Sequence, residues 1–159
     1  MYKLVADEFL ILDVFSDEVK DADKLYDKVR NAIDKFIETN EFKVMYTVSG
    51  GIVPFAALKG DQYSEALKLT DFALNEAKKL GRNRCYTFNS ETYRKFLRKR
   101  EITQELREAV SNGFRGITAF YQPVFAEDKK VPYGAEALMR FTSEKFGIVS
   151  PAEVYSHSG

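Results

Sequence analysis

The sequence predicts an α+β fold in which helices cover one face of a mostly antiparallel sheet. Short apolar and β-branched runs alternate with longer stretches whose apolar residues recur every three to four positions. Over residues 1–89 these segments follow the order ββαβαβ. Hydrophobic residues make up 45% of the chain and charged residues 30%, as in a folded globular protein.

The chain opens with a predicted hairpin. A short strand at 2–4 and a nearly continuous apolar strand at 9–15 flank the tight connection 5–8. Ser16 is a suitable N-cap for a following amphipathic helix that ends near Asn40. Its apolar positions are Val19, Ala22, Leu25, Val29, Ile33, Phe36 and Ile37.

A second strand–helix–strand unit follows. Residues 42–53 predict a strand that is bent or bulged at the glycine pair 50–51. A helix is expected over 64–80, with a left-handed cap at Gly81 and a short strand at 84–88. The residues expected to face inward from this helix are Ala66, Leu69, Ala73, Ala77 and Leu80.

The second half begins with a charged helix over 90–112. Strands at 114–125 and 131–141 follow, joined by a polar turn, and Ser150 with Pro151 marks another helix start. A cluster of basic residues on the charged helix is interpreted as a solvated face. It consists of Arg94, Lys95, Arg98, Lys99 and Arg100.

Charge and composition narrow the function classes. Lys plus Arg and Asp plus Glu both total 24, so no general nucleic-acid or anionic-membrane surface is expected. The single cysteine, Cys85, excludes an internal disulfide and suits a reducing compartment. No apolar run is long enough to span a bilayer, and no leader is recognised. We therefore expect a cytoplasmic protein whose chain contacts neither a nucleic-acid polymer nor a membrane.

Four segments resemble, in order, parts of bacterial GGDEF–EAL proteins of cyclic-di-GMP signalling. "YKLVADEFLIL" resembles the GGDEF signature hairpin, and "YTVSGGIV" the Ser-x-Gly strand of that domain. "TDFALNEAKKLGRNRCYTF" resembles its last helix and strand. The segment from Leu106 to Glu153 resembles the start of an EAL domain, with its Tyr-Gln-Pro and Glu-Ala-Leu motifs.

The resemblance implies a fold and a division into domains. Residues 1–89 would be a degenerate, N-terminally truncated GGDEF domain, a ferredoxin-like, nucleotidyl-cyclase-type sandwich lacking its first strand. Residues 90–112 would be a linker helix. Residues 113–159 would be the opening strands of an EAL (β/α)₈-type barrel, an architecture of about 250 residues.

The signature turn matches Val5, Ala6, Asp7, Glu8 and Phe9. Val5 and Ala6 stand where the family has glycines, which let a backbone approach a nucleotide closely. Asp7 and Glu8 are the acidic positions, and carboxylates suit Mg²⁺. The alternative is that they are ordinary turn residues facing water.

Lys78 and Arg82 match the phosphate-contacting pair of the family. A four-residue spacing would place both cations on one helical face, where they could hold a triphosphate. The alternative is a basic helix end that complements the helix dipole.

The EAL motif matches Glu136, Ala137 and Leu138. Glu136 corresponds to a metal ligand of the family, and the dinucleotide-contacting positions match Gln122, Leu138 and Arg140. A two-metal hydrolytic site needs several further carboxylates, so Glu136 could equally be a strand residue without a metal. His157 is interpreted as a tail residue.

The resemblance implies a non-catalytic part of a GGDEF–EAL protein that senses GTP or cyclic-di-GMP weakly. No cofactor is expected in this chain, while an active parent would use Mg²⁺ or Mn²⁺. One alternative is a part of an active phosphodiesterase whose degenerate GGDEF domain binds GTP as a regulator. Another is a dimerisation module, and a homo-oligomer is expected in any case. The helix residues that could face a second copy are Phe96, Leu97, Ile102, Leu106 and Val110.

Overall fold

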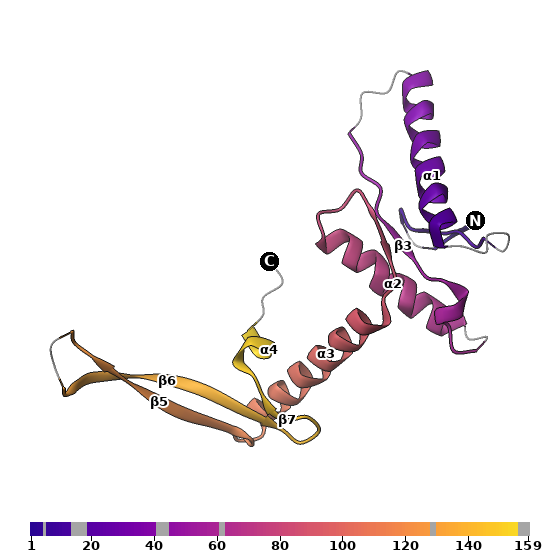
Figure 1. Ribbon diagram of the computed structural model, residues 1–159. Coiled ribbons are helices and arrows are strands. Elements are labelled where there is room, and N and C mark those ends of the chain that lie inside the picture. The colour runs from indigo at the N-terminus through magenta and orange to yellow at the C-terminus, as the bar shows by residue number, and fades with distance from the viewer. Residues whose placement is uncertain (5, 14–18, 41–44, 61–62, 128–129, 156–159) are drawn as a thin grey trace. The chain divides into compact units, whose positions relative to one another are not determined.

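The computed structural model has mixed α+β content with three small sheets among the residues that it describes (Figure 1). The chain divides into two compact units, Met1–Ser90 and Glu91–Gly159. The described residues are 1–4, 6–13, 19–40, 45–60, 63–127 and 130–155. Several features predicted from the sequence lie outside them. These are Val5 of the signature turn, the N-cap Ser16, the tail residue His157, and the parts 14–15 and 42–44 of two predicted strands.

The first unit opens with the predicted hairpin, although its strands are short. β1 (Tyr2–Lys3) pairs antiparallel with β2 (Phe9–Leu10). The N–H of Leu4 donates to the carbonyl of Glu8 at 2.9 Å and closes the turn. Ala6 adopts a φ of 50°, a left-handed conformation that favours glycine.

α1 (Val19–Thr39) confirms the long amphipathic helix. Two tyrosines tie it to the segment that precedes the next strand. The hydroxyl of Tyr26 donates to the carbonyl of Val48 at 2.9 Å. The hydroxyl of Tyr46 donates to the Asp34 carboxylate, and this hydrogen bond raises the pKa of Tyr46 above its ordinary value.

β3 (Gly50–Ile52) pairs with β4 (Cys85–Thr87), and the pairing is parallel. The register runs without interruption from Gly50 opposite Cys85 to Ile52 opposite Thr87, so the bulge predicted at the glycine pair is wrong. A parallel pair needs a crossover connection, which here contains the 3₁₀ turn η1 (Phe55–Ala57) and a long helix.

The glycines instead make room for neighbours on opposite faces of this pair. A Cβ on Gly50 would lie 2.6 Å from the Cys85 sulfur and 3.4 Å from the Tyr26 ring of α1. A Cβ on Gly51 would lie 2.4 Å from the backbone nitrogen of Leu74, in α2. Successive strand residues face opposite sides, so α1 and α2 cover different faces. The prediction that helices cover one face is therefore wrong for this pair.

α2 (Tyr63–Lys79) supplies the core of the first unit. The Phe72 ring meets the rings of Tyr86 and Phe88 edge to face, at centroid distances of 6.4 and 6.2 Å. Leu80, predicted to face inward, is 54% exposed because the helix ends one residue earlier. The buried residues of α2 are Leu69, Phe72, Ala73 and Ala77.

The second unit consists of α3 (Ser90–Ser111, with Ser90 at the unit boundary), a three-stranded antiparallel sheet and a short last helix. The sheet order is β5 (Ile117–Phe125), β6 (Pro132–Ser143), β7 (Gly147–Val149). α3 packs onto one end of this sheet. The core there consists of Ile102, Ala109, Phe141 and Val149, with Leu106, Ile117 and Phe146 packed against it.

The packing of α3 bears on the prediction that five of its apolar residues could face a second copy of the chain. Ile102 is 1% exposed, and Leu106 packs against the same core. Both are used within the unit, whereas Phe96 and Val110 remain 37% and 49% exposed. The five residues therefore do not form one free apolar face.

α4 (Pro151–Tyr155) starts where the sequence predicts, after Ser150. The N–H of Ser150 donates to a Glu153 carboxylate oxygen at 3.2 Å, and Arg98 Nε donates to the other oxygen at 2.9 Å. The Arg98 guanidinium also lies 4.5 Å from the centre of the Phe146 ring. Two hydrogen bonds lower the pKa of Glu153. The bond from Arg98 has the larger effect and the bond from Ser150 the smaller. Among the described residues, no helix has the length and apolarity to cross a membrane.

Candidate functional site

The signature turn brings one predicted site residue against another. The Glu8 carboxylate lies 3.5 Å from the ammonium of Lys78, which comes from the last turn of α2. Both side chains are about two-fifths exposed, with values of 43% and 42%. At this separation the contact is a charge interaction with little hydrogen-bond character. Asp7, the other acidic turn residue, is exposed.

The end of α2 has a well-defined cap. The N–H of Arg82 donates to the carbonyl of Ala77 at 3.2 Å, and that of Gly81 to Lys78 at 3.4 Å. Gly81 has a φ of 111°. This is the Schellman arrangement, so the predicted glycine cap is confirmed.

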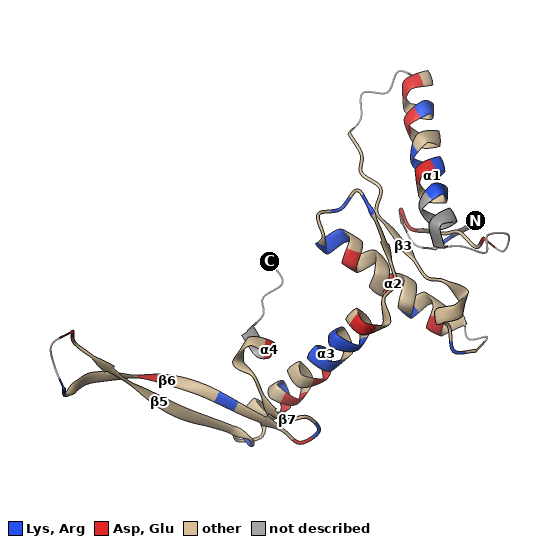
Figure 2. Ribbon diagram, viewed as in Figure 1, with Lys and Arg blue, Asp and Glu red and all other residues tan. Residues whose placement is uncertain are grey.

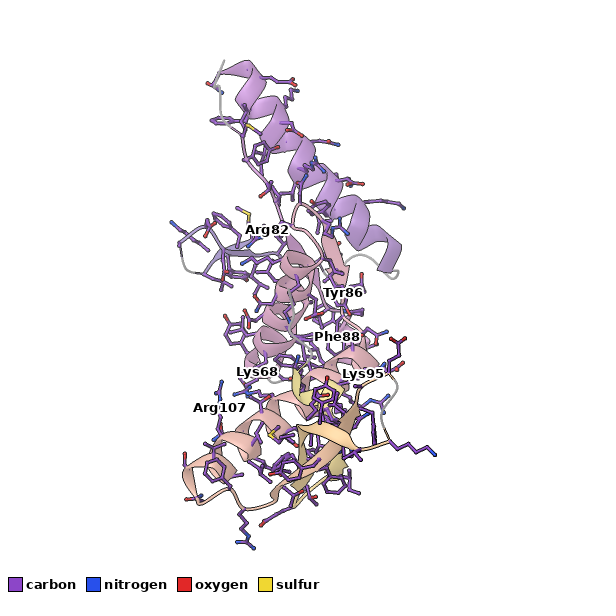
Figure 3. All side chains as sticks on the ribbon, turned by 90° about the vertical axis from the view of Figure 1, so that its left-hand side faces the viewer. Lys68, Arg82, Tyr86, Phe88, Lys95 and Arg107 are labelled. Atoms are coloured by element: carbon purple, nitrogen blue, oxygen red, sulfur yellow. The ribbon has the colours of Figure 1, made fainter. Side chains whose placement is uncertain are left out.

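The same cap overturns one argument about the cation pair. Arg82 follows the capping glycine and has a φ of 60°, so it is not helical. The expectation that four-residue spacing puts Lys78 and Arg82 on one helical face is wrong for this reason. Lys78 stays in the last helical turn, and Arg82 belongs to the loop at the end of α2 (Figure 3).

A serine next to the glycine pair holds this loop. The N–H of Asn83, itself at a φ of 51°, donates to the Ser49 hydroxyl at 3.2 Å. The N–H of Gly50 donates to the carbonyl of Arg84 at 2.9 Å. Ser49 is the serine of the Ser-x-Gly strand, but no positioning role was predicted for it from the sequence, although its place directly before two glycines was a usable signal. These bonds hold the loop between α2 and β4, in which residues 82 and 84 are arginines. The blue parts of this loop in Figure 2 are its basic residues.

The chemistry available at this end of the first unit is recognition of an anion. Lys78 and Arg82 both present cations that can contact phosphate oxygens. Lys79 is already engaged with Glu76 at 2.8 Å. Among the described residues, no three acidic, histidine or cysteine side chains gather in a way that could hold a metal ion.

The second candidate site lies on the ribbon formed by β5 and β6. The register places Gln122 opposite Glu136 and Phe120 opposite Leu138. Thr118 stands opposite Arg140. Because side chains alternate along a strand, all of these share one face of the ribbon, whereas Ala137 belongs to the other. The structure thus brings together the four predicted residues Gln122, Glu136, Leu138 and Arg140.

Phe120 belongs to this face and was not predicted. Its ring is 61% exposed, and the Arg140 guanidinium lies 5.5 Å from the ring centre. Alternation with Gln122 would have identified it from the sequence. Arg140 also donates to the carbonyl of Met139 at 3.0 Å. The face therefore carries an aromatic ring, an amide, a guanidinium and a carboxylate, and the first three are groups that can hold a base and a phosphate.

The ribbon has few other charges. β5 has no charged residue, and β6 has only Glu136 and Arg140, so it is almost entirely tan in Figure 2. Among the described residues, Glu136 belongs to no group of three or more acidic, histidine or cysteine side chains that could hold a metal ion. Glu136 offers one carboxylate, fewer than a metal held by protein alone requires.

The chain is similar to two curated proteins, and no protein-family model matches it. It is 26% identical over 151 residues to the bifunctional diguanylate cyclase/cyclic di-GMP phosphodiesterase MucR of Pseudomonas aeruginosa, covering 95% of this chain and 22% of that protein. It is 28% identical over 152 residues to the biofilm architecture maintenance protein MbaA of Vibrio cholerae, covering 95% of this chain and 19% of that protein. The chain thus spans about a fifth of the length of these relatives.

Proposed function

We propose that this chain acts in signal transduction as a non-catalytic, nucleotide-sensing part of a GGDEF–EAL cyclic-di-GMP protein. One observation carries the proposal. A single alignment covers 95% of the chain with a bifunctional diguanylate cyclase/cyclic di-GMP phosphodiesterase. Because only about a twentieth of the chain lies outside that alignment, it includes α2 of the first unit and the β5–β6 ribbon of the second.

The first unit supports binding rather than catalysis. Joining two nucleotides requires bridged metal ions and a preorganised phosphate cradle. Here Ala6 stands at a glycine-favouring position, and Glu8 is turned toward Lys78. Lys78 and Arg82 remain as phosphate-contacting groups. Their exposure gives a weak affinity that salt screens.

The second unit supports recognition of a cyclic dinucleotide without hydrolysis. Gln122 and Arg140 offer hydrogen-bond donors on one face, and Phe120 offers a stacking surface. Hydrolysis by two metal ions requires further carboxylates around Glu136. We therefore assign this face to binding.

Calorimetry and product analysis test the proposal together. We expect GTP to bind weakly in low salt, and Lys78→Ala to weaken that binding. We also expect no cyclic-di-GMP to form from GTP and none to be cleaved with Mg²⁺ or Mn²⁺. The absence of heat at millimolar GTP would contradict the sensing role. A product that disappears in Glu8→Gln, or a cleavage that disappears in Glu136→Ala, would contradict the non-catalytic role.

A second candidate is a regulatory part of an active phosphodiesterase. The shared face of these strands favours it, because Gln122, Leu138 and Arg140 match dinucleotide-contacting positions of the family, and Glu136, which matches a metal ligand, lies on the same face. In that case GTP bound near Lys78 would activate hydrolysis in the whole protein. Lys78→Ala in the full-length protein would then raise the GTP concentration needed for activation, whereas an unchanged dose response would reject this candidate.

A further inference from the structure

The strongest unassigned feature is the contact between the turn acid and the helix cation. Glu8 and Lys78 are separated by 70 residues in sequence, yet their charged atoms lie 3.5 Å apart. Each belongs to a different candidate half of the nucleotide site, the acidic turn and the phosphate-contacting helix end. The structure therefore pairs the two halves with each other.

This pairing affects what the helix end can bind. A phosphate oxygen and the Glu8 carboxylate both require the same ammonium group, so they compete for it. The Glu8 carboxylate beside Lys78 also repels a polyanion that approaches this site, because like charges at short range repel each other. Through either effect, Glu8 lowers the affinity of this site for anions when no divalent cation is present.

We propose that Glu8 is a built-in competitor that occupies Lys78 and so lowers the affinity of this site for polyphosphates. This inference rests on the proposed function, in that Lys78 is taken as the phosphate-contacting group. It predicts that removing the turn carboxylate has the opposite effect on binding from the one expected in a metal-dependent site. In a site where the turn carboxylate holds a metal for the nucleotide, removing that carboxylate weakens binding. In this chain, removing it strengthens metal-free binding.

The chain offers a matched control on the same helix. Glu76 pairs with Lys79 at 2.8 Å, so Glu76→Gln releases one cation and changes the net charge by the same amount as Glu8→Gln. A general charge effect would strengthen polyphosphate binding equally in both variants. A competitor specific to Lys78 would act only through Glu8.

The test uses inorganic tripolyphosphate with the whole chain, in low salt with a chelator that removes divalent cations. We expect Glu8→Gln to bind between about 1.5-fold and fivefold more tightly than the unmodified chain, the range for an exposed ion pair. Glu76→Gln should change the affinity less, and the gain should vanish in Glu8→Gln combined with Lys78→Ala. An equal gain in Glu76→Gln, a gain that survives loss of Lys78, or no gain at all would overturn the proposal.

A parallel titration with GTP separates this inference from the proposed function. A gain with tripolyphosphate but no GTP binding by any variant would keep the competitor and reject nucleotide sensing. GTP binding that depends on Lys78 but not on Glu8 would do the reverse. The side-chain carbon resonance of Lys78 gives a readout without ligand, since it should shift in Glu8→Gln and stay unchanged in Glu76→Gln.

Discussion

α2 and the β5–β6 ribbon use apolar residues in opposite ways. α2 buries Leu69, Phe72, Ala73 and Ala77, and its backbone approaches β3 so closely that Gly51 is required there. On the ribbon, Phe120 and Tyr121 are 61% and 71% exposed. Apolar content alone therefore does not separate core from surface in this chain.

The difference shows which positions are constrained by packing and which by register. In α2, the contribution of a side chain to stability depends on the atoms that it contacts inside the unit. On the ribbon, register places Gln122, Glu136 and Arg140 on one face without burying them. Substitutions on the ribbon should therefore change recognition more than stability, and substitutions in α2 the reverse.

The largest expected contrast is between two phenylalanines. Phe72→Ala removes a 5% exposed ring that contacts Tyr86 and Phe88, and should cost about 3–5 kcal/mol of unfolding free energy. Phe120→Ala should cost below about 1 kcal/mol, because that ring is 61% exposed. Urea unfolding followed by circular dichroism, with amide exchange to resolve the two units, measures both. Similar losses would break the comparison.

The next contrast is between two glycines. A Cβ at position 51 would lie 2.4 to 2.9 Å from backbone atoms of α2, so Gly51→Ala should cost about 1–3 kcal/mol. A Cβ on Gly134 in β6 would meet no atom of the described residues within 4 Å, so Gly134→Ala should be neutral or stabilising by up to about 1 kcal/mol. Thermal unfolding of both variants checks the sign of each effect. A tolerated Gly51→Ala would show that α2 can move away from β3.

A smaller effect is expected at the signature turn. Ala6 has a φ of 50°, so Ala6→Gly should relieve backbone strain and stabilise the first unit by about 0.5 kcal/mol, after the entropy cost of glycine. Ala135→Gly is the control, since in the strand β6 it should destabilise by about 0.5–1 kcal/mol. Chemical denaturation gives both values. A loss of stability in Ala6→Gly would show that the turn is not strained.

The smallest effect concerns pH in the second unit. Arg98 lowers the pKa of Glu153, so the ionised carboxylate stabilises the fold above the ordinary carboxyl range, and this contribution is lost as the pH falls through the lowered pKa. The pair is partly exposed, so Glu153→Gln should cost below about 1 kcal/mol at neutral pH and less in high salt. The difference from the unmodified chain should disappear in acid. A difference that stays constant with pH would show that the ionised carboxylate is not the source of the effect.

The local features of the fold were predictable from the sequence. Three-to-four spacing located α1 and α2, Gly81 located a helix end, and Ser150 with Pro151 located the start of α4. These signals depend on neighbours within one or two helical turns, where sequence distance and spatial distance agree.

The non-local features were not predictable in this way. The parallel pairing of β3 with β4 joins Gly50 to Cys85, and no short-range pattern specifies it. The contact of Glu8 with Lys78 likewise depends on the tertiary fold. Arg82 was misplaced for a different reason, because spacing was counted through a helix that ends at Lys79. Helix spacing applies only as far as the cap.

The parallel register of β3 and β4 also has a consequence for folding kinetics. β5 and β6 are consecutive antiparallel strands, and such hairpins form in about 1–10 μs. Gly50 and Cys85 can pair only after the chain between them, including α2, has been brought into a crossover. The loop-closure entropy of that crossover must be overcome before its contacts contribute. The second unit should therefore acquire its ribbon early, and the first unit should set the rate at which the whole chain becomes native.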